Sequence, residues 1–230
     1  MSGPTIRRGG VGSTSSGTFV LDAEFVLRWV VEAAARIDEQ RDFLTQLDAA
    51  IGDADHGVNM QRGFAAAVAT LQSSSDRSPG SLLEEVGKTL VYRVGGAAGP
   101  LYGTGFRLIG VTVSEAATPD GEVLLSALRA GLEGIQALGA AAAGDKTMVD
   151  AWEPAVAAFE RTLGAGGVTQ EAARNAAEAA NVGVEATLPM QARKGRASYL
   201  GSRSIGHQDP GATSTALIFG ALERALRRAT

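Results

Sequence analysis

The stretch from Leu47 to Gly63, LDAAIGDADHGVNMQRG, joins two expected helices and decides how the rest of the fold is interpreted. Three carboxylates, Asp48, Asp53 and Asp55, fall within eight residues, and glycines on both sides of the last two favour a tight turn. A turn that points three carboxylates at one place is costly unless a cation neutralises their repulsion. Oxygen ligands of this kind suit Mg²⁺, Ca²⁺ or Mn²⁺, and Mg²⁺ usually binds together with a phosphate ester. The stretch therefore predicts a metal site.

The same spacing also has a purely structural interpretation. Asp48 would lie on a helix surface, Asp53 would cap a turn, and Asp55 would cap the following helix. An EF-hand is excluded, because its loop spreads acidic positions over about twelve residues and closes with a Glu. Spacing alone leaves the metal site and the structural interpretation both open.

On either side of this stretch the chain is typical of helices joined by short breaks. The first helix follows Asp22, and its apolar residues Phe25, Trp29, Ala33 and Ile37 recur at helical spacing. Further helices are expected over residues 42–48, 57–71, 81–94, 101–117, 123–138, 150–163, 169–185 and 212–228. There is no convincing strand, no repeat of fixed period and no dividing linker. The residues thus predict about eight helices in one all-α bundle, with a ligand site where loops converge at one end.

Composition sets the limits of the domain and excludes several function classes. Residues 1–20 are rich in Gly, Ser and Thr and predict a flexible arm, which leaves residues 21–230 as the helical domain. The net charge of −4 and the lack of a dense basic run argue against nucleic acid as a partner. The absence of cysteine excludes disulfides and thiolate sites. No signal peptide or membrane-spanning run is found, so a cytoplasmic protein without membrane contact is expected.

A second group of small residues, Gly95-Gly96-Ala97-Ala98-Gly99-Pro100, precedes the helix expected from residue 101. Small residues let a backbone approach a ligand closely, and amides at a helix N-terminus bind phosphate oxygens. The group matches neither the Walker nor the Rossmann pattern. Taken by itself it favours a plain turn between two helices, with Pro100 at the start of the second.

Residues 188–210, here called the lid segment, show no periodicity and lie just before the last helix. A loop of this length in a compact domain usually has a function or is disordered. Its basic residues are Arg193, Lys194, Arg196 and Arg203. They would complement phosphates as a lid does, and Tyr199 would anchor the loop by packing. The alternative is an exposed, solvated loop, but a basic loop together with an acidic metal site favours phosphoryl chemistry.

Four stretches in order resemble the L subunit, the nucleotide-binding subunit, of dihydroxyacetone kinase. They are LDAAIGDADHGVNMQRG, GGAAGPLYGTGF, GDKTMVDAWEPA and GRASYLGSRSIGHQDPGA. Each is weak alone, but four in the right order are specific, and they span the chain from Leu47 to Ala212. The resemblance implies a single-domain, eight-helix antiparallel barrel with a nucleotide at one end.

The resemblance also implies which residues bind ligands. Asp48, Asp53 and Asp55 would hold two Mg²⁺ ions that bridge the phosphates of ADP or ATP, and no side chain would act as a nucleophile. The implied nucleotide-binding residues are His56, Gly57, Val58, Asn59, Ala97, Ala98, Gly139, Met148, Arg196, Asp209, Pro210 and Gly211. Among them, His56 and Asn59 would contact phosphate, Gly139 and Met148 would line the adenine pocket, and Arg196 would belong to the lid. Many L subunits have Ser in the place of Ala98, so here the backbone amide or a water would make that contact.

In this family the substrate is held covalently by a histidine of a separate K subunit. We expect no such region in this chain, which by itself would then phosphorylate nothing. In one version a phosphohistidine on an M subunit rephosphorylates a resident ADP; in the other, ATP is an exchangeable substrate. A homodimer is compatible with the resemblance. The alternatives are a kinase subunit for a related ketose and a nucleotide-binding regulatory module without turnover.

Overall fold

The computed structural model describes residues 19–227, which form nine α-helices and one 3₁₀-helix and contain no strand. The α-helices are α1 (Ala23–Glu39), α2 (Arg41–Ile51), α3 (His56–Ser73), α4 (Pro79–Arg93), α5 (Ala98–Ser114), α6 (Gly121–Gly139), α7 (Val149–Gly164), α8 (Thr169–Ala186) and α9 (Pro210–Arg227), and the 3₁₀-helix is η1 (Arg196–Ser204). The predicted all-α fold is therefore confirmed. None of the described helices has the length and apolar character needed to cross a bilayer.

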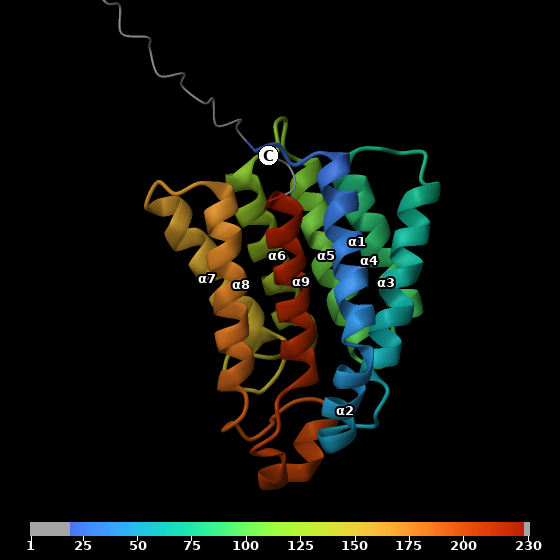
Figure 1. Cartoon of the computed structure of the whole chain (residues 1–230), viewed down its shortest axis with the longest axis vertical. Helices are drawn as coiled ribbons and strands as arrows, with labels where there is room; N and C mark the ends of the chain where they lie inside the picture. Colours follow the sequence, from blue (N-terminus) through green and yellow to red (C-terminus); the bar gives the residue numbers. More distant parts are fainter. Residues whose placement is uncertain (1–18, 228–230) are drawn as a thin grey trace, which may run out of the picture.

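Eight of these helices form a closed ring in which α1, α3, α4, α5, α6, α7, α8 and α9 each pack on the next, and α9 packs on α1 (Figure 1). Successive helices of the ring run in opposite directions. The short helix α2 and the 3₁₀-helix η1 lie beyond the ring at its lower end in Figure 1. The eight-helix antiparallel barrel implied by the resemblance is confirmed, with α2 as an additional ninth helix.

The first helix shows how sequence pattern becomes packing. The Asp22 carboxylate accepts a hydrogen bond from the Phe25 amide at 2.7 Å, which caps the start of α1. The apolar stripe that begins with Phe25 is fully buried, as its spacing predicted. Phe19 packs edge-on against Phe25 with ring centroids 5.0 Å apart, so it belongs to the core rather than to the predicted arm. The rest of that arm, residues 1–18, lies outside the described residues.

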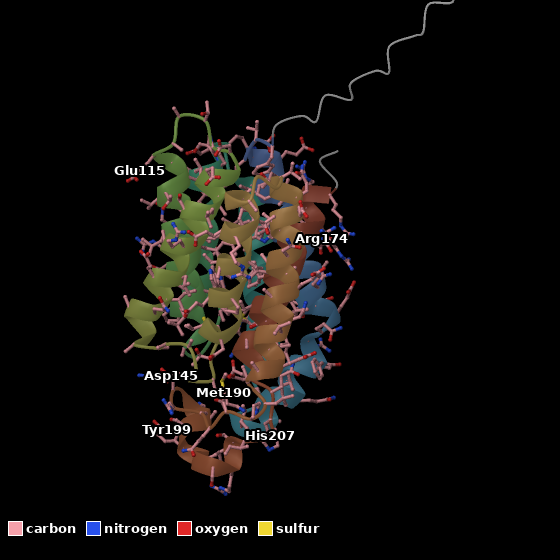
Figure 2. All side chains as sticks on the ribbon, turned by 90° about the vertical axis from the view of Figure 1, so that its left-hand side faces the viewer. Glu115, Asp145, Arg174, Met190, Tyr199 and His207 are labelled. Atoms are coloured by element: carbon pink, nitrogen blue, oxygen red, sulfur yellow. The ribbon has the colours of Figure 1, made fainter. Side chains whose placement is uncertain are left out.

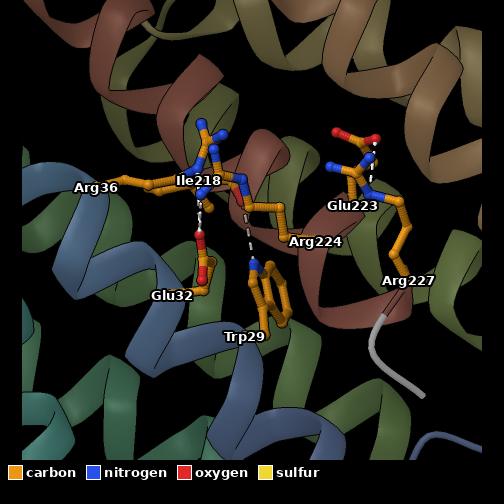
Figure 3. Close-up of polar contacts among 7 residues, drawn as sticks. All are labelled: Trp29, Glu32, Arg36, Ile218, Glu223, Arg224 and Arg227. Atoms are coloured by element: carbon orange, nitrogen blue, oxygen red, sulfur yellow. Dashed lines mark hydrogen bonds and ion pairs between the residues drawn. The ribbon is translucent and has the colours of Figure 1, made fainter.

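The ring closes where α9 meets α1, and Figure 3 shows the contacts of this seam. The indole nitrogen of Trp29, a buried residue, donates to the Ile218 carbonyl at 3.1 Å. Above it Arg224 donates to Glu32 at 2.9 Å, which joins the two helices near the surface. The buried hydrogen bond satisfies a polar group that would otherwise cost about 1–3 kcal/mol.

Facing glycines let two helices of this barrel pack closely, so few large aromatic side chains are needed between them. On α4 and α5, Gly87 faces Gly103 and Gly80 faces Gly110. A Cβ on Gly87 would lie 2.5 Å from the Gly103 carbonyl oxygen, and one on Gly110 would lie 2.6 Å from that of Gly80. The two helices are therefore in backbone contact, a separation that no larger residue allows.

The connections at the lower end of the barrel in Figure 1 are residues 52–55 with α2, residues 94–97, residues 140–148 and residues 187–209. Each of the four motif stretches contributes to one of them, so the fold brings together segments separated by more than a hundred residues. The described chain begins and ends at the opposite end. The prediction that the lid segment has no regular structure is wrong at its centre, which η1 occupies.

Candidate functional site

A cleft of about 410 Å³ opens where the four motif stretches meet at the end of the barrel. This volume is typical of a small-molecule site. Of the predicted residues, the lining includes Asp48, Asp53, Asp55, His56, Ala97, Ala98, Gly139, Met148, Arg196, Asp209, Pro210 and Gly211. The lining does not include Gly57, Val58 and Asn59. The walls are acidic on one side, apolar on another and basic along the lid segment.

The acidic corner consists of Asp48, Asp53 and Asp55, each of which has a carboxylate oxygen within 4.8 Å of the others. Asp48 is buried at the end of α2, and its Oδ2 accepts hydrogen bonds from the amides of Asp55 at 2.9 Å and His56 at 3.1 Å. These two bonds fold the turn back over α2, so that the two exposed carboxylates meet the buried one. Asp48 is thus not on a helix surface, and Asp55 makes no side-chain cap, which contradicts the purely structural interpretation.

The acidic corner fits a hard divalent cation. An octahedral Mg²⁺ holds its oxygen ligands about 2.1 Å from itself, so opposite ligands are about 4.2 Å apart. Carboxylate oxygens up to 4.8 Å apart need only a small inward movement, or a second ion, to reach this geometry. Because the cluster contains neither cysteine nor histidine, its donor set is all oxygen and suits Mg²⁺ better than zinc.

The glycine-rich turn, residues 95–100, leads from α4 into α5 and forms the next wall. No side chain caps α5, so the amides at its start are available to an anion in the cleft. Asn59 supports this turn from behind, because a Cβ on Gly95 would lie 2.6 Å from its Nδ2. Arg62 donates to the Asn59 Oδ1 at 2.7 Å and to the Arg93 carbonyl at 2.8 Å. The turn is thus both a helix connection, as its residues suggested, and part of the cleft.

His56 links the acidic corner to a network of buried hydroxyl groups formed by α9 and Tyr102 of α5. Its Nε2 lies 3.0 Å from the Ser214 Oγ, which is 2.7 Å from the Tyr102 hydroxyl. Tyr102 also donates to the Gly211 carbonyl at 2.9 Å, so the network reaches the start of α9. Burial lowers the pKa of His56, although the charges of Asp48 and Asp55 act in the opposite direction.

The remaining walls differ in character. The apolar wall is formed by Leu101, Ile135, Gly139, Ala141, Met148 and Val149, which suits a planar base. Across the cleft, the Arg196 Nε donates to the Asp53 Oδ2 at 3.0 Å, so η1 reaches the acidic corner.

Tyr199 is 87% exposed, and the prediction that it anchors the lid segment by packing is wrong. Figure 2 shows Tyr199 at the far lower end of the molecule, on η1.

The family described as the DAK2 domain matches residues 50–224 of this chain. The chain belongs to the DAK2 domain family. The ADP-binding subunit DhaL of PEP-dependent dihydroxyacetone kinase 1 from Listeria innocua is 42% identical over 201 residues, which are 87% of this chain and 96% of that protein. The corresponding DhaL subunit from Escherichia coli is 44% identical over 193 residues, covering 82% and 90%. The predicted resemblance to dihydroxyacetone kinase L subunits, and with it the kinase class, is confirmed.

A solved structure shares the fold of this DAK2 domain. The dihydroxyacetone kinase from C. freundii, in complex with AMP-PNP and Mg²⁺, matches with a TM-score of 0.68 and 24% identity. The match covers 97% of this chain but 38% of that one. At this identity it supports the helical barrel and not the roles of single residues.

One residue of the DAK2 domain that sequence analysis passed over is Lys146, in the loop between α6 and α7. It is 1% exposed, and its Nζ donates to the carbonyl oxygens of Thr187 at 2.8 Å, Met190 at 3.2 Å and His207. Met190 and His207 lie together at the base of the lid segment in Figure 2. The stretch GDKTM was part of the resemblance, but its lysine carried no signal of burial, because its three partners are 41 to 61 residues away.

Asp209, predicted to belong to the lid, is buried beside this lysine at the start of α9. Its Oδ2 accepts from the Ala212 amide at 2.7 Å, and its own amide donates to the Thr187 hydroxyl at 3.0 Å. Burial above all, together with the neighbouring Asp150, raises the pKa of Asp209 to about 7, while the Ala212 hydrogen bond and Lys146 oppose the shift. The DAK2 domain thus carries a carboxyl group that titrates near neutral pH when no ligand is bound.

This shift makes stability depend on pH in a defined direction. The folded-state pKa of about 7 lies above the unfolded value of 3.8, so the neutral carboxyl favours folding, and this contribution is lost as the pH rises from about 4 to about 7. The difference reaches roughly 4 kcal/mol above pH 7, since one pKa unit corresponds to about 1.4 kcal/mol. We expect Asp209→Asn to flatten the pH dependence of urea unfolding in the ligand-free protein. Asp38→Asn, an exposed change on α1, is the control; parallel wild-type and Asp209→Asn curves would contradict the assignment.

Proposed function

We propose that this chain is the ADP-binding subunit of a dihydroxyacetone kinase. It would pass the γ-phosphoryl group of Mg²⁺-bound ATP to dihydroxyacetone held on a separate K subunit. The observation that carries the proposal is the convergence of the acidic corner, the uncapped start of α5 and Arg196 on one cleft. The relatives from L. innocua and E. coli, named as ADP-binding subunits, support the same assignment.

The proposed roles follow from position in the cleft. Asp48, Asp53 and Asp55 would hold two Mg²⁺ ions, which would neutralise phosphate charge. The amides of Ala97 and Ala98 receive phosphate oxygens, and Ala98 needs no hydroxyl because its backbone makes the contact. Other proposed nucleotide-binding residues that line the cleft are His56 at the start of α3, Gly139 and Met148 beside the base, and Asp209, Pro210 and Gly211 at the start of α9. Gly57, Val58 and Asn59 follow His56 in α3 outside the lining, and they are proposed from the resemblance alone.

Phosphoryl transfer of this kind depends on positioning and charge rather than on a protein nucleophile. Arg196 pairs with Asp53, and its guanidinium is exposed enough to turn toward a phosphate in the cleft. The lid segment then excludes water from the transferred group. Each of these steps uses a group that already lines the cleft.

The partners are proposed from the same geometry. The γ-phosphoryl group must leave through the open end of the barrel, so the K subunit docks over η1 and the acidic corner. An M subunit carrying phosphohistidine would recharge a resident ADP at the same end. A cytoplasmic location and a homodimer stay predictions. Cross-links from the K subunit to the opposite end of the barrel would contradict this docking.

The first measurement is native mass spectrometry of the purified chain before any nucleotide is added. We expect a mass excess of one ADP with two Mg²⁺ that persists through desalting and disappears with EDTA. Adding phosphorylated M subunit should then convert bound ADP to ATP, and adding the K subunit with dihydroxyacetone should convert it back. Nucleotide binding without either conversion would instead indicate a regulatory module. A chain that binds no nucleotide with Mg²⁺ present would refute the proposal.

A further inference from the structure

Lys146 lines the cleft but has no part in the proposed contacts, and its side chain joins the residues before and after η1. Its ammonium donates to Thr187 and Met190, which precede η1, and to His207, which follows it. An ammonium group has three donors, and here each has a backbone carbonyl as its partner. The side chain is 1% exposed, so these bonds form away from bulk water.

We propose that Lys146 is the positioning residue of the lid segment. By binding both ends of this segment, one side chain fixes the position of η1 over the cleft and limits the rate at which nucleotide leaves. The inference rests on the proposed function for its nucleotide, but the anchoring itself concerns only the fold of the lid segment.

Each of the other ties of the lid segment to the rest of the barrel is a single bond, such as the Asp209 amide to the Thr187 hydroxyl and the Arg196 Nε to Asp53. The Gly206 amide donates to the Leu188 carbonyl at 2.8 Å, and the Arg193 amide donates to the Asp145 carbonyl at 3.1 Å. Fixing two ends of a long segment removes most of the conformational freedom between them. Lys146 supplies three such constraints from one charged group, and hydrogen bonds to a charged group are stronger than neutral ones.

The loop that presents Lys146 is itself rigidly held. The Asp150 carboxylate accepts from the Thr147 amide at 2.7 Å and from the Gly144 amide, which bends residues 144–147 around it. Lys146 has a φ of 63°, a left-handed conformation that a non-glycine residue adopts at a cost of roughly 1–3 kcal/mol. The Asp150 bonds offset this cost and aim the side chain at the lid segment.

The same contacts argue against a catalytic role for Lys146. With its three donors directed at carbonyl oxygens, the ammonium has none left for a phosphate of the nucleotide. Burial lowers the pKa of Lys146, and the carboxyl groups of Asp209 and Asp150, both buried nearby, oppose that shift. Lys146 therefore acts through the lid segment rather than on the substrate.

The test uses Lys146→Met in the full chain, with Lys88→Met on the exposed face of α4 as the matched control. In nucleotide-free protein we expect amides of the lid segment to exchange with deuterium at least about tenfold faster, while amides of α4 and α5 do not change. We also expect Mg²⁺-ADP, chased by excess unlabelled nucleotide, to dissociate at least about tenfold faster. Lys88→Met should match the wild type in both measurements.

The outcomes separate this inference from the proposed function. Unchanged exchange in the lid segment would overturn the anchoring, and faster exchange with unchanged ADP dissociation would overturn its control of nucleotide release. If wild-type protein bound no ADP while Lys146→Met still loosened the lid segment, the proposed function would fail and the anchoring would stand.

A second variant keeps the test decisive if Lys146→Met does not fold. Lys146→Ala leaves a space that propylammonium matches in length and charge, whereas 1-propanol matches it in size alone. Restoration of slow exchange and slow ADP release by propylammonium, and not by propanol, would support a role for the charged donor. Equal effects of both compounds would show that filling the space is sufficient and would overturn the proposal.

Discussion

Replacing Asp53 with Asn is expected to remove Mg²⁺-dependent ADP binding while leaving the barrel folded. Asp53 is an exposed member of the acidic corner, and removing one charge from a repulsive cluster does not weaken the metal-free protein. Its ion pair with Arg196 joins side chains that are 36% and 69% exposed, so its loss costs at most about 1 kcal/mol. Mutation of a residue that only supports a metal ligand typically lowers metal affinity about 10- to 100-fold. Loss of the ligand itself should cost more, so the affinity for ADP in the presence of Mg²⁺ should fall by at least about 100-fold.

Isothermal titration calorimetry with ADP and Mg²⁺ measures the affinity, and circular dichroism measures the fold. Asp38→Asn removes the same charge from α1 and should bind ADP normally. Asp48→Ala should weaken both ADP binding and the fold of the turn, because the amides of Asp55 and His56 lose their acceptor. A loss of helical signal in Asp53→Asn, or ADP binding as tight as in the wild type, would count against the metal site.

Gly183→Ala is expected to cause a large loss of stability although it adds a single methyl group. In a helix such as α8, Ala is normally favoured over Gly by about 1 kcal/mol. Here a Cβ would overlap the Asp150 carbonyl oxygen and lie 2.9 Å from the Ala151 Cα, and neither backbone atom can turn aside. Overpacking of this kind costs about 1–3 kcal/mol or more, so the clash outweighs the helix preference. We expect a net loss near 2 kcal/mol, or a melting temperature lower by roughly 4–8 °C.

Gly164→Ala provides the matched control for that experiment, because it lies at the end of α7 and a Cβ there meets no atom within 4 Å. It should leave the melting temperature unchanged or raise it slightly. Since Gly183 packs against the first turn of α7, its substitution should also weaken ADP binding by disturbing Asp150 and the loop that it holds. A stabilised Gly183→Ala protein would mean that α7 and α8 have room to separate.

Much of the fold followed from local pattern. The apolar stripe and cap of α1 were visible because each depends on residues within one or two turns. The closing contact between Trp29 and Ile218 was not visible, because it joins positions 189 residues apart. The 3₁₀-helix η1 was missed for a different reason: a helix of three residues per turn leaves no 3.6-residue stripe, and the only buried residue of η1 is Ser204.

The site was predicted unevenly for similar reasons. The acidic corner lies within eight residues, so its convergence was readable from spacing, and the structure confirms that Asp48, Asp53 and Asp55 lie together. Lys146 could not be recognised, since a lysine among polar residues normally lies in solvent. Its burial depends on three carbonyl groups that only the tertiary fold brings near.

The seam between α9 and α1 has a consequence for how this domain can be attached to others. Because those helices are antiparallel neighbours, α1 begins and α9 ends at the end of the barrel away from the cleft (Figure 1). A covalent tether at either position therefore leaves the lid segment and the acidic corner uncovered. The matching region of the C. freundii kinase is 38% of a longer chain. The same barrel can therefore occur as a free subunit or as one domain of a larger polypeptide, and in neither case does the connecting chain need to cross the cleft.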